Sequence, residues 1–197
     1  MSGQYAVRSF VLYPMYNEHM KMPEQIETER LVLRMPQLDD GPAIFSGWAQ
    51  DKEVTRYLTW RPHKSLEQTN EFIQGCLSAW EQETRLPYTI TLTETADVIG
   101  MIDPRIEGPK MGIGYGAARA YWGKGYVPEA VRAIIHWAFQ QPSIYRVYAT
   151  TDVENIASQR VLEKVGMQCE GLLRKYIIHP NLSDVARDSY MYAIIKQ

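Results

Sequence analysis

Residues 111–140 read MGIGYGAARAYWGKGYVPEAVRAIIHWAFQ and contain the pattern that decides the fold. Two glycines, Gly123 and Gly125, separate a strand-like segment from a strongly helical one. Pro128 suits the first turn of a helix, where its missing N–H is no loss. Beyond the glycines, apolar residues recur at the three- and four-residue spacing of one buried helix face, namely Val127, Ala130, Val131, Ile134, Ile135 and Ala138. The stretch therefore predicts a strand, a glycine loop and a helix in succession.

This arrangement is suited to binding an anion. Glycine lets the backbone approach a ligand closely, and the start of a helix has unpaired N–H donors under a partial positive charge. The same residues also suit a tight turn that binds nothing. The GxxxxGK[ST] pattern of nucleotide hydrolases is absent. Gly112, Gly114 and Gly116 alternate inside a strand and open no helix, which argues against a dinucleotide fold. The spacing favours a loop that grips a phosphorylated cofactor.

The composition limits the classes of function. The chain has 197 residues, 45% of them hydrophobic and 22% charged, as expected for one soluble domain with a good core. A net charge of −2 gives no support for nucleic-acid binding. No apolar run approaches the ~18 residues that span a bilayer, and the N-terminus lacks a secretory signal. Cys76 and Cys169 form no metal-ligand pattern and indicate thiols in a reducing compartment. We expect a cytoplasmic protein without a metal or a membrane.

The order of the predicted elements indicates a mixed α/β fold. Residues 1–23 lack periodicity and predict an irregular N-terminal arm, followed by a single domain over residues 24–197. Helices are expected at residues 39–48, 52–58 and 65–83, after the glycine loop, and from Asn155 to Gly166. Seven strands are expected, at residues 29–34, 88–93, 98–106, 111–118, 145–151, 168–179 and 186–195. A helix between the fourth and fifth strands implies a right-handed crossover and a parallel pair.

Over residues 27–192 the chain resembles the GCN5-related N-acetyltransferase (GNAT) superfamily, and within it the RimJ/RimL-like branch. The resemblance is carried by ETERLVLR, AYWGKGYVPEAVRAIIHWAF, ENIASQRVLEKVGM, and EGLLRKY with RDSYMYA, in matching order. It implies a mostly antiparallel sheet of six to seven strands, with helices on both faces and a splayed parallel pair that holds acetyl-CoA. It also implies acetyl transfer from acetyl-CoA to a primary amine by direct attack in a ternary complex, in a monomer or a homodimer.

The resemblance assigns the glycine loop to the cofactor. In the family, an R/Q-x-x-G-x-G/A loop binds the pyrophosphate of acetyl-CoA through backbone N–H groups. Gly123 and Gly125 fill the glycine positions, while Ala120 stands where Arg or Gln would be. The expected cofactor contacts are Ala117, Ala118, Arg119, Trp122, Gly123, Lys124, Gly125, Tyr126, Val127, Asn155 and Ser158.

The catalytic residues are less well defined by the resemblance. Many members carry a tyrosine in the helix after Asn155 that protonates the departing thiolate, and the matching residue here is Leu162. Ser158 is therefore the candidate for hydrogen bonding to the CoA sulfur. Relatives often place a carboxylate near the position of Gly112, which this chain lacks. The candidates for a general base stay open as Asp103, Glu107, His63 and His179.

The acceptor pocket of this branch is lined by the early helices and the C-terminal hairpin. That points to Tyr57, Trp60, Tyr88 and Tyr176 as wall residues, although aromatic side chains are more often part of a core. The implied acceptor is a protein or peptide N-terminus, an amino acid or a small amine. A competing hypothesis is a non-catalytic acyl-CoA-binding module with a sensing or interaction role, because the tyrosine is missing and the base is undefined.

Overall fold

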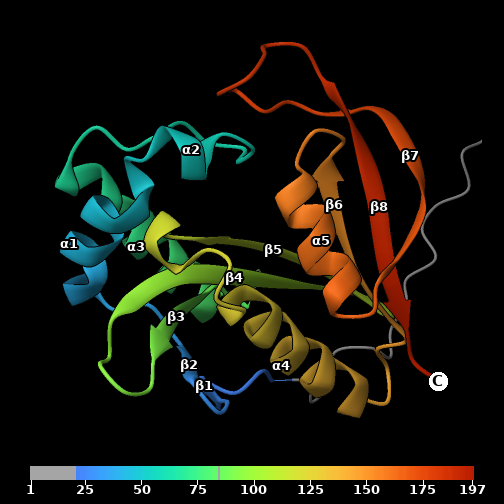
Figure 1. Ribbon diagram of the computed structural model, residues 1–197. Helices are drawn as coiled ribbons and strands as arrows, with labels where there is room; N and C mark the ends of the chain where they lie inside the picture. Colours follow the sequence, from blue (N-terminus) through green and yellow to red (C-terminus); the bar gives the residue numbers. More distant parts are fainter. Residues whose placement is uncertain (1–20, 84) are drawn as a thin grey trace, which may run out of the picture.

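The computed structural model describes residues 21–83 and 85–197, and the expected arm over residues 1–23 lies almost entirely outside them. The strands are β1 (Gln25–Glu27), β2 (Leu31–Arg34), β3 (Tyr88–Leu92), β4 (Val98–Glu107), β5 (Lys110–Ala117), β6 (Arg146–Asp152), β7 (Gln168–Ile177) and β8 (Arg187–Ile195). They form one sheet in the order β1-β2-β3-β4-β5-β6-β8-β7 (Figure 1). The sheet has eight strands rather than six to seven, because the short β1 pairs with β2.

The helices follow the predicted order. They are α1 (Gly41–Ile44), α2 (Lys52–Thr55), α3 (Leu66–Glu81), α4 (Tyr126–Gln140) and α5 (Ile156–Lys164). Ser65 caps α3 by accepting a hydrogen bond from the N–H of Gln68, as the sequence predicts. The helix expected at residues 52–58 ends at Thr55. Within the described part of the chain, no helix is long and apolar enough to cross a membrane.

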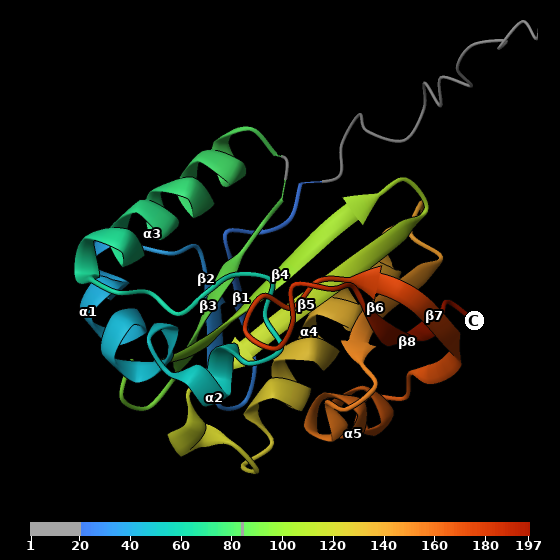
Figure 2. The same ribbon diagram turned by 90° about the horizontal axis from the view of Figure 1, so that it is seen from above.

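The helices cover both faces of the sheet (Figure 2). Ile102 of β4 packs in the cluster that contains Ile134 of α4, whereas its neighbour Met101 packs in the cluster with Ile73 of α3. Adjacent residues of a strand point to opposite faces. The helices α4 and α3 therefore cover opposite faces of the same strand, and the predicted arrangement of helices is confirmed.

A carboxylate in the first turn of α4 ties that helix to the start of β2. Glu129 accepts hydrogen bonds from the Thr28 hydroxyl at 2.7 Å, from the Arg30 N–H at 3.0 Å and from Arg30 Nε at 2.7 Å. Arg30 also donates through Nη1 to the carbonyl of Lys124 at 3.2 Å. Burial opposes ionisation of Glu129, but the hydrogen bonds from Thr28 and Arg30 and the charge of Arg30 lower its pKa. The contact holds the glycine loop against β2.

We expect Glu129→Gln to lower the free energy of unfolding by about 1 kcal/mol at pH 7. This value lies at the low end for charge-assisted hydrogen bonds, because Arg30 is half-exposed and solvent screens the interaction. The pKa of Glu129 is lower in the folded protein than in the unfolded protein, where it is ~4.3, so its ionised form stabilises the fold above that pH. This stabilisation is lost as the pH falls through the folded-state pKa. The difference between wild type and variant should therefore shrink below pH ~4. Urea unfolding at several pH values measures it. Glu71→Gln, on the exposed side of α3, is the control. An equal difference at all pH values would contradict the assignment.

Candidate functional site

The parallel strands β5 and β6 separate shortly after they begin. They pair at Lys110 with Arg146, Met111 with Val147 and Gly112 with Tyr148, and no further pair joins them. Beyond Gly112, β5 continues along β4 as far as Ala117, while β6 continues along β8. The two strands therefore form a fork that opens away from Gly112, and the predicted splayed parallel pair is confirmed (Figure 1).

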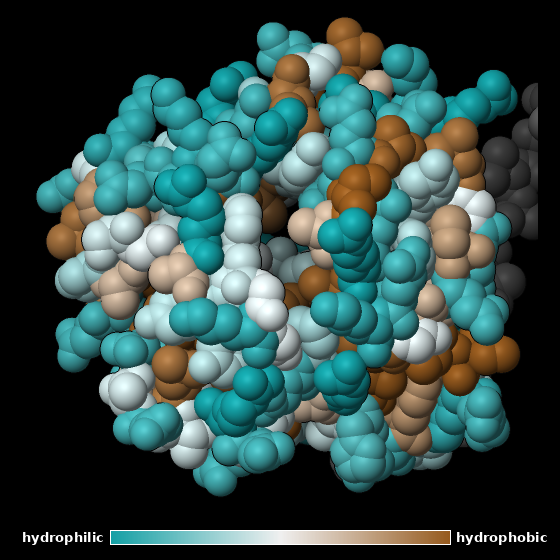
Figure 3. All heavy atoms as spheres, viewed as in Figure 1, coloured by the Kyte–Doolittle hydropathy of each residue, from teal (hydrophilic) through white to brown (hydrophobic). Residues whose placement is uncertain are grey.

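The fork opens onto a hollow of the surface. Figure 3 shows the molecule hollowed between the α2 side and the side formed by α5 and β6. The part of β5 that is unpaired toward β6, residues 113–117, is followed by the glycine loop. A backbone edge without a strand partner still has N–H and C=O groups that need hydrogen bonds. An extended ligand in the fork would satisfy that requirement.

The glycine loop presents unpaired N–H donors at the open end of the fork. Gly123 and Gly125 have φ of 75° and 84°, a left-handed conformation that favours glycine. A Cβ at Gly123 would meet nothing within 4 Å, so the surface above it is open. In the described part of the chain, the N–H groups of Gly123, Lys124 and Gly125 donate to no backbone carbonyl. The first N–H groups of α4, at Tyr126 and Val127, lack partners by helix geometry. The loop can hold an anion.

Two of the predicted cofactor contacts have their N–H groups already engaged. The N–H of Ala118 donates to the carbonyl of Ile99 at 2.8 Å, and that of Trp122 donates to the carbonyl of Arg119 at 3.1 Å. A short 3-10 turn at Arg119–Tyr121 thus uses the N–H of Trp122, which is not available to a cofactor. Its indole Nε1 donates to the carbonyl of Ala117 at 2.7 Å, and its side chain is 48% exposed beside the loop.

Positive charge near the loop comes from three side chains. Arg119 forms an ion pair with Asp51 at 2.9 Å, which joins the loop to the start of α2. Lys124 lies over the ring of Tyr121 at 5.2 Å. Arg30, which the sequence did not single out, lies 3.4 Å from the Cβ position of Gly125. Arg30 belongs to the ETER segment before β2, which the resemblance includes. Its contact with the loop joins residues that are 94 positions apart in the sequence, so no local pattern indicates it.

Two hydroxyl groups meet across the fork. Asn155 caps α5 by accepting a hydrogen bond from the N–H of Ser158, as predicted. Ser158 Oγ lies 2.9 Å from the Tyr115 hydroxyl of β5, which sequence reasoning missed. Burial raises the pKa of Tyr115, and the hydrogen bond with Ser158 opposes that shift. Leu162 is fully buried in the core. Two hydrogen-bonded hydroxyl groups, those of Ser158 and Tyr115, therefore lie where α5 faces β5.

The four candidates for a general base have different surroundings. Asp103 Oδ2 is shared between Arg85 at 3.2 Å and Arg105 at 3.0 Å. Both ion pairs use the same oxygen of Asp103, whose side chain is 17% exposed. Glu107 is 44% exposed and accepts hydrogen bonds from the Tyr148 hydroxyl at 2.9 and 3.0 Å. Of the two carboxylates, Glu107 is the more accessible.

The two histidines are buried. His63 is 7% exposed, its Nδ1 lies 2.8 Å from the Thr69 hydroxyl, and its ring stacks on Trp60. His179 is 5% exposed, contacts the ring of Tyr57, and has Nε2 at 3.7 Å from Asp152. Burial lowers the pKa of both, although Asp152 opposes the shift at His179. This burial favours packing roles for both.

Asp152 organises the turn after β6. It accepts hydrogen bonds from the N–H of Glu154 at 2.9 Å and from Arg187 at 2.6 and 3.1 Å, and it is fully buried. Asn181 donates to the carbonyls of Thr55 and Trp60 at 2.7 and 2.8 Å. These contacts fasten the α2 segment to the loop between β7 and β8.

The four aromatic residues that the sequence predicts for the acceptor pocket have different surroundings. Tyr57 is half-buried, and its hydroxyl donates to the carbonyl of Glu154 at 3.3 Å, so it joins the α2 segment to the β6–α5 turn. Trp60 packs against Trp48, His63 and Phe72, and Tyr176 of β7 is 49% exposed. The prediction for Tyr88 is wrong. Its side chain is fully buried in the core against Trp80, and its hydroxyl donates to the carbonyl of Pro23.

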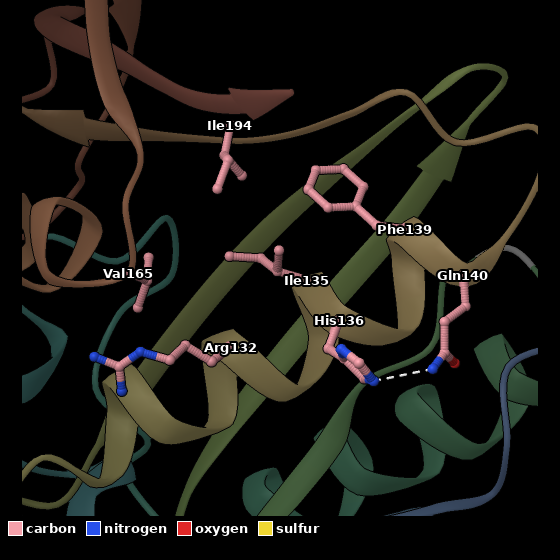
Figure 4. A pocket seen from close by; sticks show the side chains of 7 residues that line it. All are labelled: Arg132, Ile135, His136, Phe139, Gln140, Val165 and Ile194. Atoms are coloured by element: carbon pink, nitrogen blue, oxygen red, sulfur yellow. Dashed lines mark hydrogen bonds between the residues drawn. The ribbon is translucent and has the colours of Figure 1, made fainter. Parts of the chain in front are cut away.

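A second depression lies elsewhere on the molecule. It measures about 390 Å³ and lies between the C-terminal half of α4, the end of α5 and β8 (Figure 4). None of the predicted site residues lines it. Its lining residues are Arg132, Ile135, His136, Phe139, Gln140, Val165 and Ile194. The fork and the glycine loop, rather than this depression, bring together most of the residues that the sequence predicts for the cofactor.

Comparisons with known proteins agree with this geometry. The family model described as an acetyltransferase (GNAT) domain matches residues 30–168. The uncharacterized N-acetyltransferase p20 of Bacillus licheniformis is 35% identical over 181 residues, 88% of this chain and 97% of p20. The structure of a GNAT-family acetyltransferase from Bacillus anthracis superposes with a TM-score of 0.76 at 29% identity, covering 87% of this chain and 98% of that one.

RimL, a ribosomal L7/L12 α-N-protein acetyltransferase whose structure was solved in complex with coenzyme A, shares the fold. The TM-score is 0.76 at 23% identity over 88% of this chain and 98% of RimL. The forked parallel pair, the left-handed glycine loop at the start of α4 and the match of the family model lead to one conclusion. The chain belongs to the GNAT acetyltransferase family.

Proposed function

We propose that this protein is an N-acetyltransferase that moves the acetyl group of acetyl-CoA to a primary amine. The observation that carries the proposal is the fork between β5 and β6, which ends at a loop of unpaired N–H donors. RimL acetylates an α-amine of a ribosomal protein, and its structure holds coenzyme A. The acceptor proposed here is a peptide or protein N-terminus, an amino acid or a small amine.

The loop and the fork bind different parts of the cofactor in this proposal. The N–H groups of Gly123, Lys124, Gly125, Tyr126 and Val127 take the pyrophosphate, because they converge at a helix start with open space above it. The pantetheine arm lies along residues 113–117 of β5, whose edge toward β6 is unpaired. The reactive thioester therefore lies toward Gly112, at the closed end of the fork.

Two hydroxyl groups serve the departing thiolate. Acetyl transfer forms a bond from nitrogen to carbon and breaks the bond from carbon to sulfur. Tyr115 Oη and Ser158 Oγ lie 2.9 Å apart, and either hydroxyl can donate to the other. In this proposal Tyr115 is the donor, which leaves the hydroxyl hydrogen of Ser158 for the sulfur. A hydrogen bond to the charged form of a group favours that form. Ser158 thus takes the role that a tyrosine at the position of Leu162 would have, while Asn155 fixes the first turn of α5.

The acceptor enters beside the α2 segment. Tyr57 and Tyr176 are partly exposed, and Trp60 stiffens the segment by packing with Trp48. An alkyl amine with a pKa near ~10 is mostly protonated at pH 7 and must lose a proton to attack. Holding amine and thioester in one orientation supplies much of the rate.

Release of free thiol from acetyl-CoA tests the function. We expect thiol release that depends on the acceptor and saturates with both substrates, in a panel of amino acids, peptides with free N-termini and small amines. A rise in melting temperature with acetyl-CoA, but no thiol release with any acceptor, would instead support a non-catalytic acyl-CoA-binding module. Absence of both effects would contradict any role for acyl-CoA.

The loop has a separate test. Gly125→Val should raise the dissociation constant of CoA at least ~10-fold, about 1.4 kcal/mol, because the residue has a φ of 84° that valine does not tolerate. Gly108→Val is a matched control, since Gly108 also has a positive φ of 63° but lies in the turn between β4 and β5. Isothermal titration measures both variants. Unchanged affinity in a folded Gly125→Val protein would remove the loop from the binding site.

A further inference from the structure

At the closed end of the fork, the Tyr148 ring lies where a side chain at position 112 of β5 would be. A Cβ added to Gly112 would lie 3.0 Å from both Cζ and Oη of Tyr148. Contacts this short require the tyrosine to move. Tyr148 is the β6 partner of Gly112 in the last pair before the strands separate. Its phenol ring therefore fills the space of the missing side chain at position 112.

The Tyr148 hydroxyl is bound to a carboxylate. It donates to the two oxygens of Glu107, at 3.0 and 2.9 Å. Burial first, and then the hydrogen bond to Glu107 and its charge, raise the pKa of Tyr148 to about 12, while Arg105 opposes the shift. The phenol thus keeps its proton at neutral pH and holds it toward Glu107. Lys110 lies 3.3 Å from Glu107 and 5.2 Å from the Tyr148 ring centre, and Tyr176 also faces Tyr148.

This side of β5 is open to an acceptor. Gly112, Gly114 and Gly116 alternate along the strand and share one face. A Cβ at Gly114 would meet only Arg105 Nη2, at 3.7 Å, and one at Gly116 would meet nothing within 4 Å. A substrate can therefore approach the backbone closely along residues 114–116 and reach the thioester beside Tyr148.

We propose that the Tyr148–Glu107 pair accepts the proton that the amine loses during acetyl transfer. The inference rests on the proposed function. It assigns Tyr148 as the group that contacts the reacting nitrogen and Glu107 as a positioning residue behind it that receives the proton. The pair supplies the carboxylate that β5 lacks at position 112, where any side chain would crowd the Tyr148 ring.

The step balances as follows. The neutral amine attacks the thioester carbon, so that a nitrogen–carbon bond forms and the nitrogen becomes positively charged and acidic. Its proton passes to the Tyr148 oxygen while the phenol proton passes to Glu107. The carbon–sulfur bond breaks, the thiolate leaves with the electron pair, and it takes a proton from solvent beside Ser158. Glu107 returns its proton to solvent, which leaves an amide and free CoA thiol.

Two conservative variants test the pair. Tyr148→Phe keeps the ring over Gly112 and removes the hydroxyl, while Glu107→Gln keeps a hydrogen-bond acceptor and removes the proton acceptor. Each should lower kcat ~100-fold, the lower range for general acid–base catalysis, and leave the KM for acetyl-CoA within about twofold. Small buffer bases should restore part of the rate of Glu107→Gln in proportion to their concentration, and should not accelerate wild type. A purely structural role gives no such rescue.

The controls separate this inference from the proposed function. Tyr145→Phe, at an exposed tyrosine just before β6, should match wild type. Ser158→Ala should also lower kcat, but buffer bases should not restore it, because the thiolate side is affected. Wild-type turnover retained by Tyr148→Phe and Glu107→Gln would overturn the inference and leave the function intact. A rate loss in Glu107→Gln that no buffer base restores would also overturn it. Absence of thiol release in wild type would instead overturn the proposed function.

Discussion

The end of pairing between β5 and β6 after Gly112 is the constraint on which the site depends. All seven residues of β6 pair with β8, and all eight residues of β5 pair with β4, so each strand is held in place by its other neighbour. The sheet can therefore open internally without losing its continuity. An unpaired strand edge at an outer border invites aggregation, whereas this one lies inside the sheet, with α4 and α2 packed against β5 and α5 packed against β6.

Several contacts hold the fork in its open form. On the α4 side, Glu129 and Arg30 fix the glycine loop to β2. On the α5 side, a hydrogen bond between the hydroxyl groups of Ser158 and Tyr115 joins α5 to β5. At the closed end, the Tyr148 ring lies on Gly112. Each contact joins segments distant in sequence, and together they position the donors of the loop and the hydroxyls of the fork along one path.

Local patterns predicted the helices and strands well. The alternation of strand residues, the cap at Ser65 and Gly125 at the start of α4 are each encoded within a few residues. The glycine loop was predictable for the same reason. Long-range contacts were not. Nothing near Tyr148 indicates that its ring replaces a side chain at Gly112, and Arg30 reaches the loop only through the fold. Tyr88 shows the opposite error, because aromatic residues near a site often belong to the core, where it packs on Trp80.

Amide hydrogen exchange with and without acetyl-CoA tests the central claim most directly. If the cofactor lies in the fork, its binding should slow exchange at residues 113–117 on the unpaired edge of β5 and at the N–H groups of residues 123–127. The remaining strands of the sheet, already paired, should change little. Protection confined to the depression beside Arg132 and Phe139, with residues 113–117 and 123–127 unchanged, would contradict the account.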